Sequence, residues 1–139
     1  MRYRFLITVL LMILSLVFVV MSADAQSTNR FEVDIPFQFV VGGRILPAGN
    51  YAVERLDSGK PSILRLKNLD NGMMRLIFCQ RVEKERASTT SFLLFVQREG
   101  KFFLSQAWDQ GNLNGNEVPL PKTKRPAIGE KSVAVKATH

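Results

Sequence analysis

Hydrophobic and polar residues alternate along most of this chain after position 30, and the alternation predicts β-strands rather than helices. Phe31, Val33 and Ile35 share one face of the first such segment, and the residues between them are acidic. A period of two residues is typical of a strand with one buried face. Turn signals recur about every ten residues, at Gly42-Gly43, Asp57-Ser58-Gly59, Asp70-Asn71-Gly72 and Glu99-Gly100. The pattern therefore favours short antiparallel strands joined by tight turns.

The same pattern predicts the other strands, over residues 37–41, 51–55, 63–69, 73–82, 91–98 and 101–108. In the long strand at 73–82, Met74, Leu76 and Phe78 form the more apolar face, while Cys79 lies on a face of mixed polarity. The Asn-Gly pair that precedes this strand favours the type I′ turn of a two-residue hairpin.

Residues 91–108 form the most hydrophobic hairpin, which we expect to be the core, with Trp108 on the same face as Phe102 and Leu104. The predicted fold class is all-β, either an antiparallel β-sandwich or a partly open β-barrel of about seven strands with Greek-key-like connections. We expect this domain to cover residues 26–110. Residues 111–139 are rich in glycine, asparagine and proline and carry a basic cluster, which indicates an extended tail. A short final strand at Val133 and Val135 remains open.

The N-terminus has the three parts of an export signal. Arg2 and Arg4 precede an uncharged apolar run, and Ala23 and Ala25 supply the small residues that a signal peptidase requires. We therefore predict that residues 1–25 are a signal peptide, cut before Gln26, and that the protein is exported to the periplasm or the cell exterior. The alternative is an uncleaved membrane anchor, because the run is close to the shortest that spans a bilayer, about 17 residues.

The stretch LPAGNYAVERL, from position 46 to 56, has a mechanical interpretation. Pro47 fixes φ at the start of a turn, and Gly49 adopts a positive φ beyond it. Tyr51 then enters a strand with its ring over the core and its hydroxyl directed back to the turn backbone, which resembles the tyrosine corner of immunoglobulin-like and fibronectin type III sandwiches. We expect these three residues to be structural rather than ligand-binding.

Two longer blocks resemble a family of small exported bacterial proteins of the acidobacterial type. The first is IPFQFVVGGRILPAGNYAV, which fits the family pattern IPF-x-F-x-x-G followed by LPAG-x-Y-x-V; the second is FFLSQAW with a downstream Gly- and Pro-containing segment. Phe102 stands where that family has tyrosine, and Asn116-Glu117-Val118 precedes its proline. The resemblance covers roughly residues 33–124 and implies export and a β-rich domain, without an activity or a site.

The charge of the chain indicates an anionic partner. The formal net charge is +7, and removal of the signal lowers it by one. Excess positive charge attracts anionic polymers and lipid headgroups, so we expect an acidic envelope polymer or a membrane surface as the partner, rather than nucleic acid; simple solubility is the alternative. The residues predicted to contact the partner are Arg81, Lys84, Arg86, Trp108, Lys122, Lys124 and Arg125. For Trp108, a place in the core is the favoured alternative.

Catalytic patterns are missing from the sequence. Cys79 is the only cysteine and His139, the last residue, is the only histidine. A nucleophile with a histidine base and a Cys/His metal set therefore have no candidates, and we expect no cofactor and a small buried role for the thiol. The predicted function is a non-catalytic exported β-domain that serves as a binding or structural module at the cell envelope. The alternatives are a barrel that binds a small lipid-like ligand and an enzyme without a recognisable motif; the oligomeric state stays open.

Overall fold

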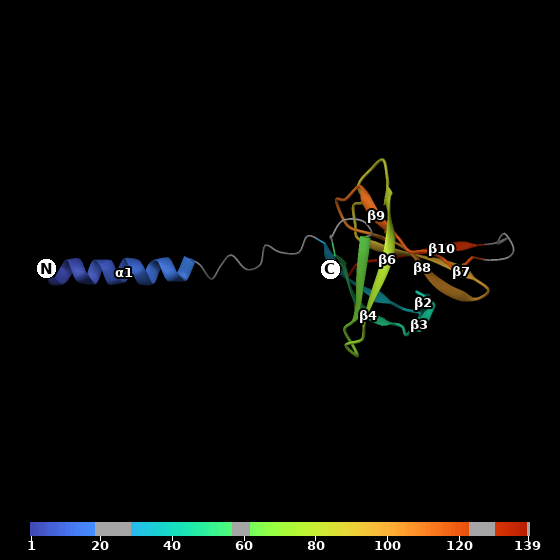
Figure 1. Cartoon of the computed structure of the whole chain (residues 1–139), viewed down its shortest axis with the longest axis horizontal. Helices are drawn as coiled ribbons and strands as arrows, with labels where there is room; N and C mark the ends of the chain where they lie inside the picture. The colour runs from blue at the N-terminus through green and yellow to red at the C-terminus, as the bar shows by residue number, and fades with distance from the viewer. Residues whose placement is uncertain (19–28, 57–61, 123–129, 139) are drawn as a thin grey trace.

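The computed structural model describes residues 1–18, 29–56, 62–122 and 130–138, and these residues form one helix and ten strands (Figure 1). The elements are α1 (Arg2–Phe18), β1 (Arg30–Ile35), β2 (Phe39–Val41), β3 (Arg44–Leu46), β4 (Gly49–Leu56), β5 (Ser62–Asn68), β6 (Met74–Glu83), β7 (Phe92–Arg98), β8 (Lys101–Trp108), β9 (Asn114–Glu117) and β10 (Lys131–Lys136). The chain is thus all-β outside α1, as expected. The strand count exceeds the expected seven by β3 and β9, which are only three and four residues long, and by β10, the final strand that the sequence leaves open.

The strands form one open sheet in the order β1-β4-β5-β6-β9-β8-β2-β3, with β7 added to β8 and β10 added to β7. Every pairing is antiparallel except that of β2 with β8, which is parallel. Side chains from β1, β5, β7 and β8 meet in a single buried cluster, which includes Val33, Leu64, Phe95 and Leu104. Because strands from both ends of the order share this core, the sheet curls around it (Figure 1).

One margin of the sheet stays open beside β6. The first half of β6, Met74–Cys79, pairs with β5 along one edge, whereas β9 occupies the other edge only from Gln80 onward. Across the gap lies β3, which pairs with β2 alone within the described residues. We call the gap between Met74–Phe78 and Arg44–Leu46 the open seam.

The buried face of β6 is the opposite of the one that its hydrophobicity predicts. Ile77 and Cys79 are buried, whereas Met74, Leu76 and Phe78 are 50%, 56% and 66% exposed. The cause is the pairing with β5, in which Leu64 and Leu66 face the core and lie opposite Ile77 and Arg75. The register of a strand is set by its neighbour as well as by its own pattern, so the more apolar side of β6 faces outward.

A β-bulge in β8 changes the face of Trp108. Leu94 lies opposite Gln106, but the next residue, Phe95, lies opposite Leu104, so Ser105 is the extra residue. A bulge shifts the alternation by one position. Leu104 and Ala107 consequently both belong to the core cluster, and Trp108 lies on the other face. The expected register of Trp108 with Leu104 is wrong for this reason.

The turn between β5 and β6 is wider than the predicted type I′ turn. Gly72 has a positive φ of 75°, while Asn71 is outside the positive-φ region. The side-chain oxygen of Asn68 instead accepts hydrogen bonds from the backbone N–H groups of Asp70 and Asn71, at 2.8 and 3.1 Å. Two consecutive positive-φ residues, as type I′ requires, occur at Gly42-Gly43 and Glu99-Gly100.

The C-terminal residues belong to the sheet. β9 lies between β6 and β8, and β10 pairs with β7 through Val133 and Val135. Thr138 then donates its backbone N–H to Glu32 O at 2.9 Å, which joins the chain end to β1. The sheet therefore continues past the expected domain boundary at residue 110, and the final strand is present. The pattern concealed β9 because Asn114–Glu117 contains no hydrophobic residue.

The helix α1 covers the basic residues Arg2 and Arg4 and most of the apolar run of the expected export signal. The cleavage residues Ala23 and Ala25 lie outside the described residues. Within the part of the chain that the structure describes, no helix has the length and apolarity needed to cross a membrane.

Candidate functional site

Tyr51 forms the expected corner at the start of β4. Its hydroxyl donates a hydrogen bond to Pro47 O at 2.6 Å, and its ring packs edge-on against Phe39 with centroids 5.3 Å apart. Burial raises the pKa of the Tyr51 hydroxyl. Gly49 has a φ of 154°, and a Cβ there would lie 2.6 Å from Asp70 Oδ2. The motif thus holds the entry to β4 by backbone geometry and one hydroxyl.

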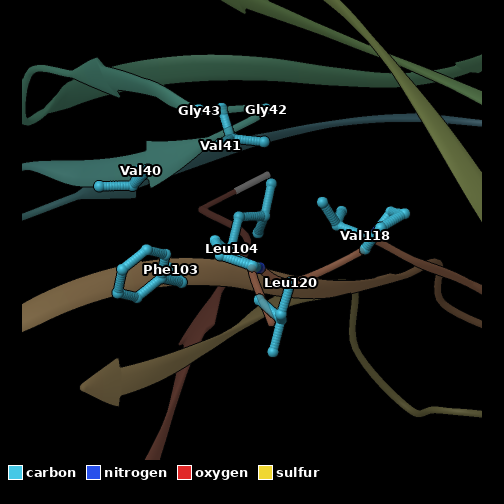
Figure 2. A pocket seen from close by; sticks show the side chains of 10 residues that line it. Val40, Val41, Gly42, Gly43, Phe103, Leu104, Val118 and Leu120 are labelled. Atoms are coloured by element: carbon cyan, nitrogen blue, oxygen red, sulfur yellow. The ribbon is translucent and has the colours of Figure 1, made fainter. Parts of the chain in front are cut away.

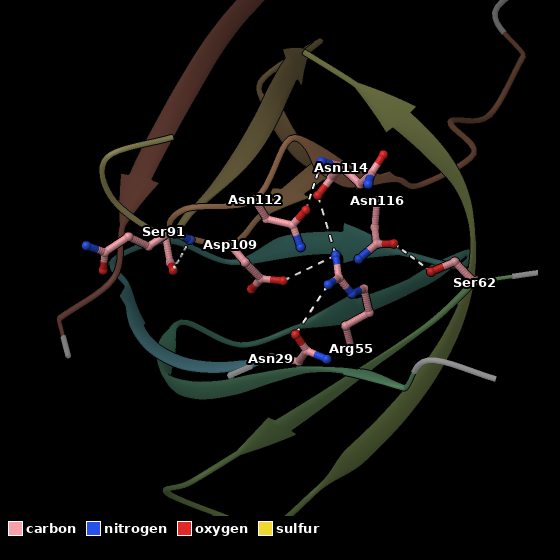
Figure 3. Close-up of polar contacts among 9 residues, drawn as sticks. Asn29, Arg55, Ser62, Ser91, Asp109, Asn112, Asn114 and Asn116 are labelled. Carbon is pink, nitrogen blue, oxygen red and sulfur yellow. Dashed lines mark hydrogen bonds and ion pairs between the residues drawn. The ribbon is translucent and has the colours of Figure 1, made fainter. Parts of the chain in front are cut away.

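A buried ion pair joins β4 to the end of β8 (Figure 3). Arg55 Nη1 lies 3.5 Å from Asp109 Oδ2, and the two side chains are 8% and 10% exposed. Arg55 Nη1 also donates to Asn114 O at 3.4 Å, and Nη2 donates to Asn29 Oδ1 at 3.3 Å. The guanidinium therefore contacts three segments at once. Its geometry is that of a cross-link from β4 to the end of β8, to β9 and to the start of β1.

Two further polar contacts surround this ion pair. Ser62 Oγ of β5 donates to Asn116 Oδ1 of β9 at 2.6 Å, and both residues are buried. Ser91 Oγ accepts the backbone N–H of Gln110 at 2.9 Å. Figure 3 shows the Ser62 and Asn116 side chains turned toward each other near the ion pair. Among the described residues no group of three or more His, Cys, Asp or Glu side chains is placed to hold a metal ion.

Trp108 is 2% exposed and is covered on the outer side of the sheet. Lys84 Nζ lies 3.9 Å from its ring centroid, and Phe92 is its cross-strand partner. Beneath the ring is Gly115, where a Cβ would lie 2.6 Å from Trp108 Cδ2. The indole N–H donates to Gln106 Oε1 at 2.9 Å. Trp108 is thus buried, and Lys84 lies between its ring and any binding partner that approaches from solvent.

The other predicted contact residues lie on several segments of the chain. Arg81 and Arg86 are exposed on β6 and in the loop after it. Lys122 is exposed and follows Pro121, whose carbonyl oxygen accepts a hydrogen bond from Arg98 Nη1 at 3.0 Å. The positions of Lys124 and Arg125 lie outside the described residues.

An apolar groove lies next to the open seam and extends into it, and Figure 2 shows its first part, which lies outside the seam itself. Its first part has a volume of about 250 Å³ and is lined by Val40, Val41, Gly42, Gly43, Phe103, Leu104, Val118, Pro119, Leu120 and Pro121. Figure 2 shows Val41 and Val118 on opposite sides of this hollow. A second part of about 320 Å³ shares Val41 and Val118 and continues past Arg44 to Arg75 and Phe78. We call the two parts together the seam groove.

The outer row of β6, defined as Met74, Leu76 and Phe78, adjoins the seam groove. Its cross-strand partners on β5 are, in the same order, Lys67, Arg65 and Ile63. Arg65 also forms an ion pair with Glu54 of β4. Apolar side chains and cations therefore alternate across the outer face of β5 and β6, and this face is open to solvent along β6.

Cys79 lies on the inner face of β6 and is 3% exposed. Its Sγ lies 3.6 Å from Ile77 O. Burial raises the pKa of the thiol to about 11, which keeps it protonated and unreactive at neutral pH. The expected small buried role is thereby confirmed.

Sequence reasoning missed the seam groove for two reasons. One wall, from Val118 to Pro121, lies in residues that the composition assigns to a tail. The outer row was expected to face the core, so its exposure was not foreseen. A usable signal existed in β5, where Arg65 and Lys67 must face solvent and therefore place their cross-strand partners outward. Comparison of this chain with protein-family models, with curated proteins and with solved structures gives no match.

Proposed function

We propose that this chain is a non-catalytic exported β-domain that acts as a binding or structural module at the cell envelope and prefers anionic partners. In this proposal residues 1–25 are a cleaved signal peptide, and the curled sheet works as a partly open barrel. The observation that carries the proposal is the outer row, an exposed apolar line with cationic neighbours, beside the seam groove.

The exposure of the outer row favours a binding surface over a merely solvated one. Single exposed hydrophobic residues are ordinary on protein surfaces, whereas contiguous ones mark contacts with partners or membranes. Leu76 and Phe78 are more than half exposed and lie two residues apart on one strand face. Ile45 of β3, on the other margin of the seam, is 59% exposed. The apolar residues thus flank the groove on both sides.

The charges around this surface favour an anionic partner. Arg44 and Arg75 are the charged residues that line the seam groove, and neither part is lined by Asp or Glu. Lys67 is exposed beside Met74 on the outer face. Apolar side chains flanked by cations are typical of surfaces that bind acidic lipids or acidic polymers.

Binding to anionic material tests this proposal. The purified protein is mixed with phosphatidylglycerol vesicles, with phosphatidylcholine vesicles and with dextran sulfate resin, at low and high salt. We expect retention on the anionic materials that falls as salt rises. Leu76→Ser combined with Phe78→Ser removes much of the retention, and neutralising Lys122, Lys124 and Arg125 weakens it. Leu113→Ser is the matched control, because Leu113 is 49% exposed but lies outside the seam lining. The proposal is contradicted if the Leu76→Ser/Phe78→Ser variant and the Leu113→Ser control bind equally to all of these materials.

A further inference from the structure

We propose that the open seam accepts a strand: an extended segment of a partner protein, with alternating apolar and acidic residues, adds to the free edge of β6. This inference rests on the proposed binding function and names the partner class. An exposed strand edge presents unpaired N–H and C=O groups, and extended peptides bind such edges through main-chain hydrogen bonds. Within the described residues, Met74–Phe78 has no strand on its seam side.

Both margins of the seam present the same arrangement of side chains. On β3, Leu46 is buried and Ile45 is exposed, so alternation places Arg44 on the inner side with Leu46. On β6, Ile77 is buried, so Arg75 lies on the inner side and Leu76 on the outer side. The inner side therefore carries one arginine beside a buried apolar residue on each margin, and the outer side is apolar on both.

This arrangement specifies the sequence of the inserted strand. Its outward side chains would lie between Ile45 and the outer row, where apolar residues bury surface. Its inward side chains would lie near Arg44 and Arg75, where carboxylates form charge-assisted hydrogen bonds. Arg75 Nε is shielded from solvent and has no hydrogen-bond partner among the described residues. An alternating apolar and acidic strand thus satisfies both sides of the seam.

A strand fits the seam better than the other possible occupants. An acyl chain in the groove would cover the free edge of β6 without pairing its backbone groups, and buried unpaired groups are unfavourable. Edge pairing between two copies through β6 would bring Arg75 close to its own counterpart, in a chain of net charge +7. Like charges on neighbouring strands are destabilising.

The test is a titration followed by fluorescence anisotropy. The probe is a fluorescein-labelled octapeptide of four Val-Glu repeats, and the reference is an octapeptide of four Val-Lys repeats. We expect the acidic peptide to bind at least about tenfold more tightly, which corresponds to one lost charge-assisted contact. Arg44→Gln combined with Arg75→Gln abolishes this preference. Lys131→Gln combined with Lys136→Gln, on exposed positions of β10 outside the lining of the seam groove, is the matched control and leaves it unchanged.

Hydrogen exchange provides a second readout, because a purely electrostatic contact would leave the exchange rates of the β6 amides unchanged. Bound acidic peptide should slow amide exchange within Met74–Phe78 of the otherwise unaltered protein. The inference is overturned if the acidic peptide binds without this protection or if the two peptides bind equally. It is also overturned if sodium dodecanoate displaces the peptide, or if sedimentation velocity shows that the protein dimerises through the seam. If the protein is retained on anionic vesicles but does not bind the peptide, the strand site is contradicted and the proposed function is not. If it neither binds the peptide nor is retained on the vesicles, both are contradicted.

Discussion

The hydroxyl of Tyr51 donates its hydrogen bond to the carbonyl oxygen of Pro47, four residues earlier, at 2.6 Å. The ring is buried against Phe39, so the hydroxyl has lost most of its contact with water. Replacement by phenylalanine keeps the ring and leaves the Pro47 carbonyl without this donor. We expect Tyr51→Phe to lower the free energy of unfolding by about 1–3 kcal/mol, measured by urea denaturation.

The same variant separates a structural corner from a ligand loop. Because the backbone of the turn and the lining of the seam groove are unchanged, Tyr51→Phe should bind anionic vesicles as the wild type does. A variant of unaltered stability that no longer binds would show that the LPAGNY stretch contacts the partner directly.

Position 115 must be glycine because the indole ring of Trp108 lies directly above it. A Cβ at this position would come within 2.6 to 2.8 Å of three atoms of the Trp108 indole, closer than packed carbon atoms allow. We expect Gly115→Ala to lower the free energy of unfolding by about 1–3 kcal/mol, the usual cost of overpacking. Thermal unfolding followed by the fluorescence of Trp108, the single tryptophan, measures this directly.

A double-mutant cycle supplies the control for this contact. In the background of Trp108→Leu, the added methyl group of alanine has space, so Gly115→Ala should cost much less than in the wild type. Circular dichroism follows unfolding in both backgrounds. If the cost is equal in both, the indole ring is not what excludes a side chain from Gly115.

Much of the fold could be predicted from local pattern, and the outcome for each strand has a physical reason. Phe31, Val33 and Ile35 face the core as the alternation predicts, since an isolated amphipathic strand has only one face to bury. In β6 both faces contain hydrophobic residues, so local pattern was insufficient. The choice between them depends on the register with β5, which is a tertiary relationship.

The candidate site was less accessible to sequence reasoning. The bulge at Ser105 reverses the face of Trp108, and nothing in an alternating apolar run marks where an extra residue sits. The strand Asn114–Glu117 pairs through its backbone and places a glycine under an indole, so its sequence resembles a loop. The seam groove depends on the wall that follows this strand, from Val118 to Pro121, and on the outward face of β6. It emerges only when the strands are assembled.

The buried pair of Arg55 and Asp109 gives a further prediction. Each side chain is about nine-tenths buried, with Nη1 and Oδ2 3.5 Å apart. Removing one partner leaves a buried charge uncompensated, so Arg55→Met should lower the free energy of unfolding by about 3–5 kcal/mol. Guanidinium denaturation of the variant and of the wild type measures the difference.

The double variant Arg55→Met with Asp109→Leu distinguishes charge from shape. It removes both charges and fills similar space with apolar atoms, which is often neutral for a buried ion pair. We expect it to recover a large part of the stability that Arg55→Met loses. No recovery would indicate that the contacts of Arg55 with Asn29 and Asn114, rather than the ion pair, account for its contribution.

The buried thiol of Cys79 predicts a loss of stability at alkaline pH. Burial raises its pKa from 9.0 to about 11 in the folded protein. Below pH 9 the thiol is protonated in both states, so its contribution is fully present. Between pH 9 and 11 the unfolded chain releases its proton first, and unfolding becomes more favourable as pH rises. The expected loss across this window is about 2–3 kcal/mol.

Cys79→Ala isolates this effect from other groups that titrate in the same range. The variant has no thiol, so the difference in unfolding free energy between wild type and variant should shrink as pH rises from 9 to 11. Urea denaturation at several pH values within that window measures the difference. A difference that stays constant would mean that the thiol ionises equally in both states, which requires solvent to reach Cys79 in the folded protein.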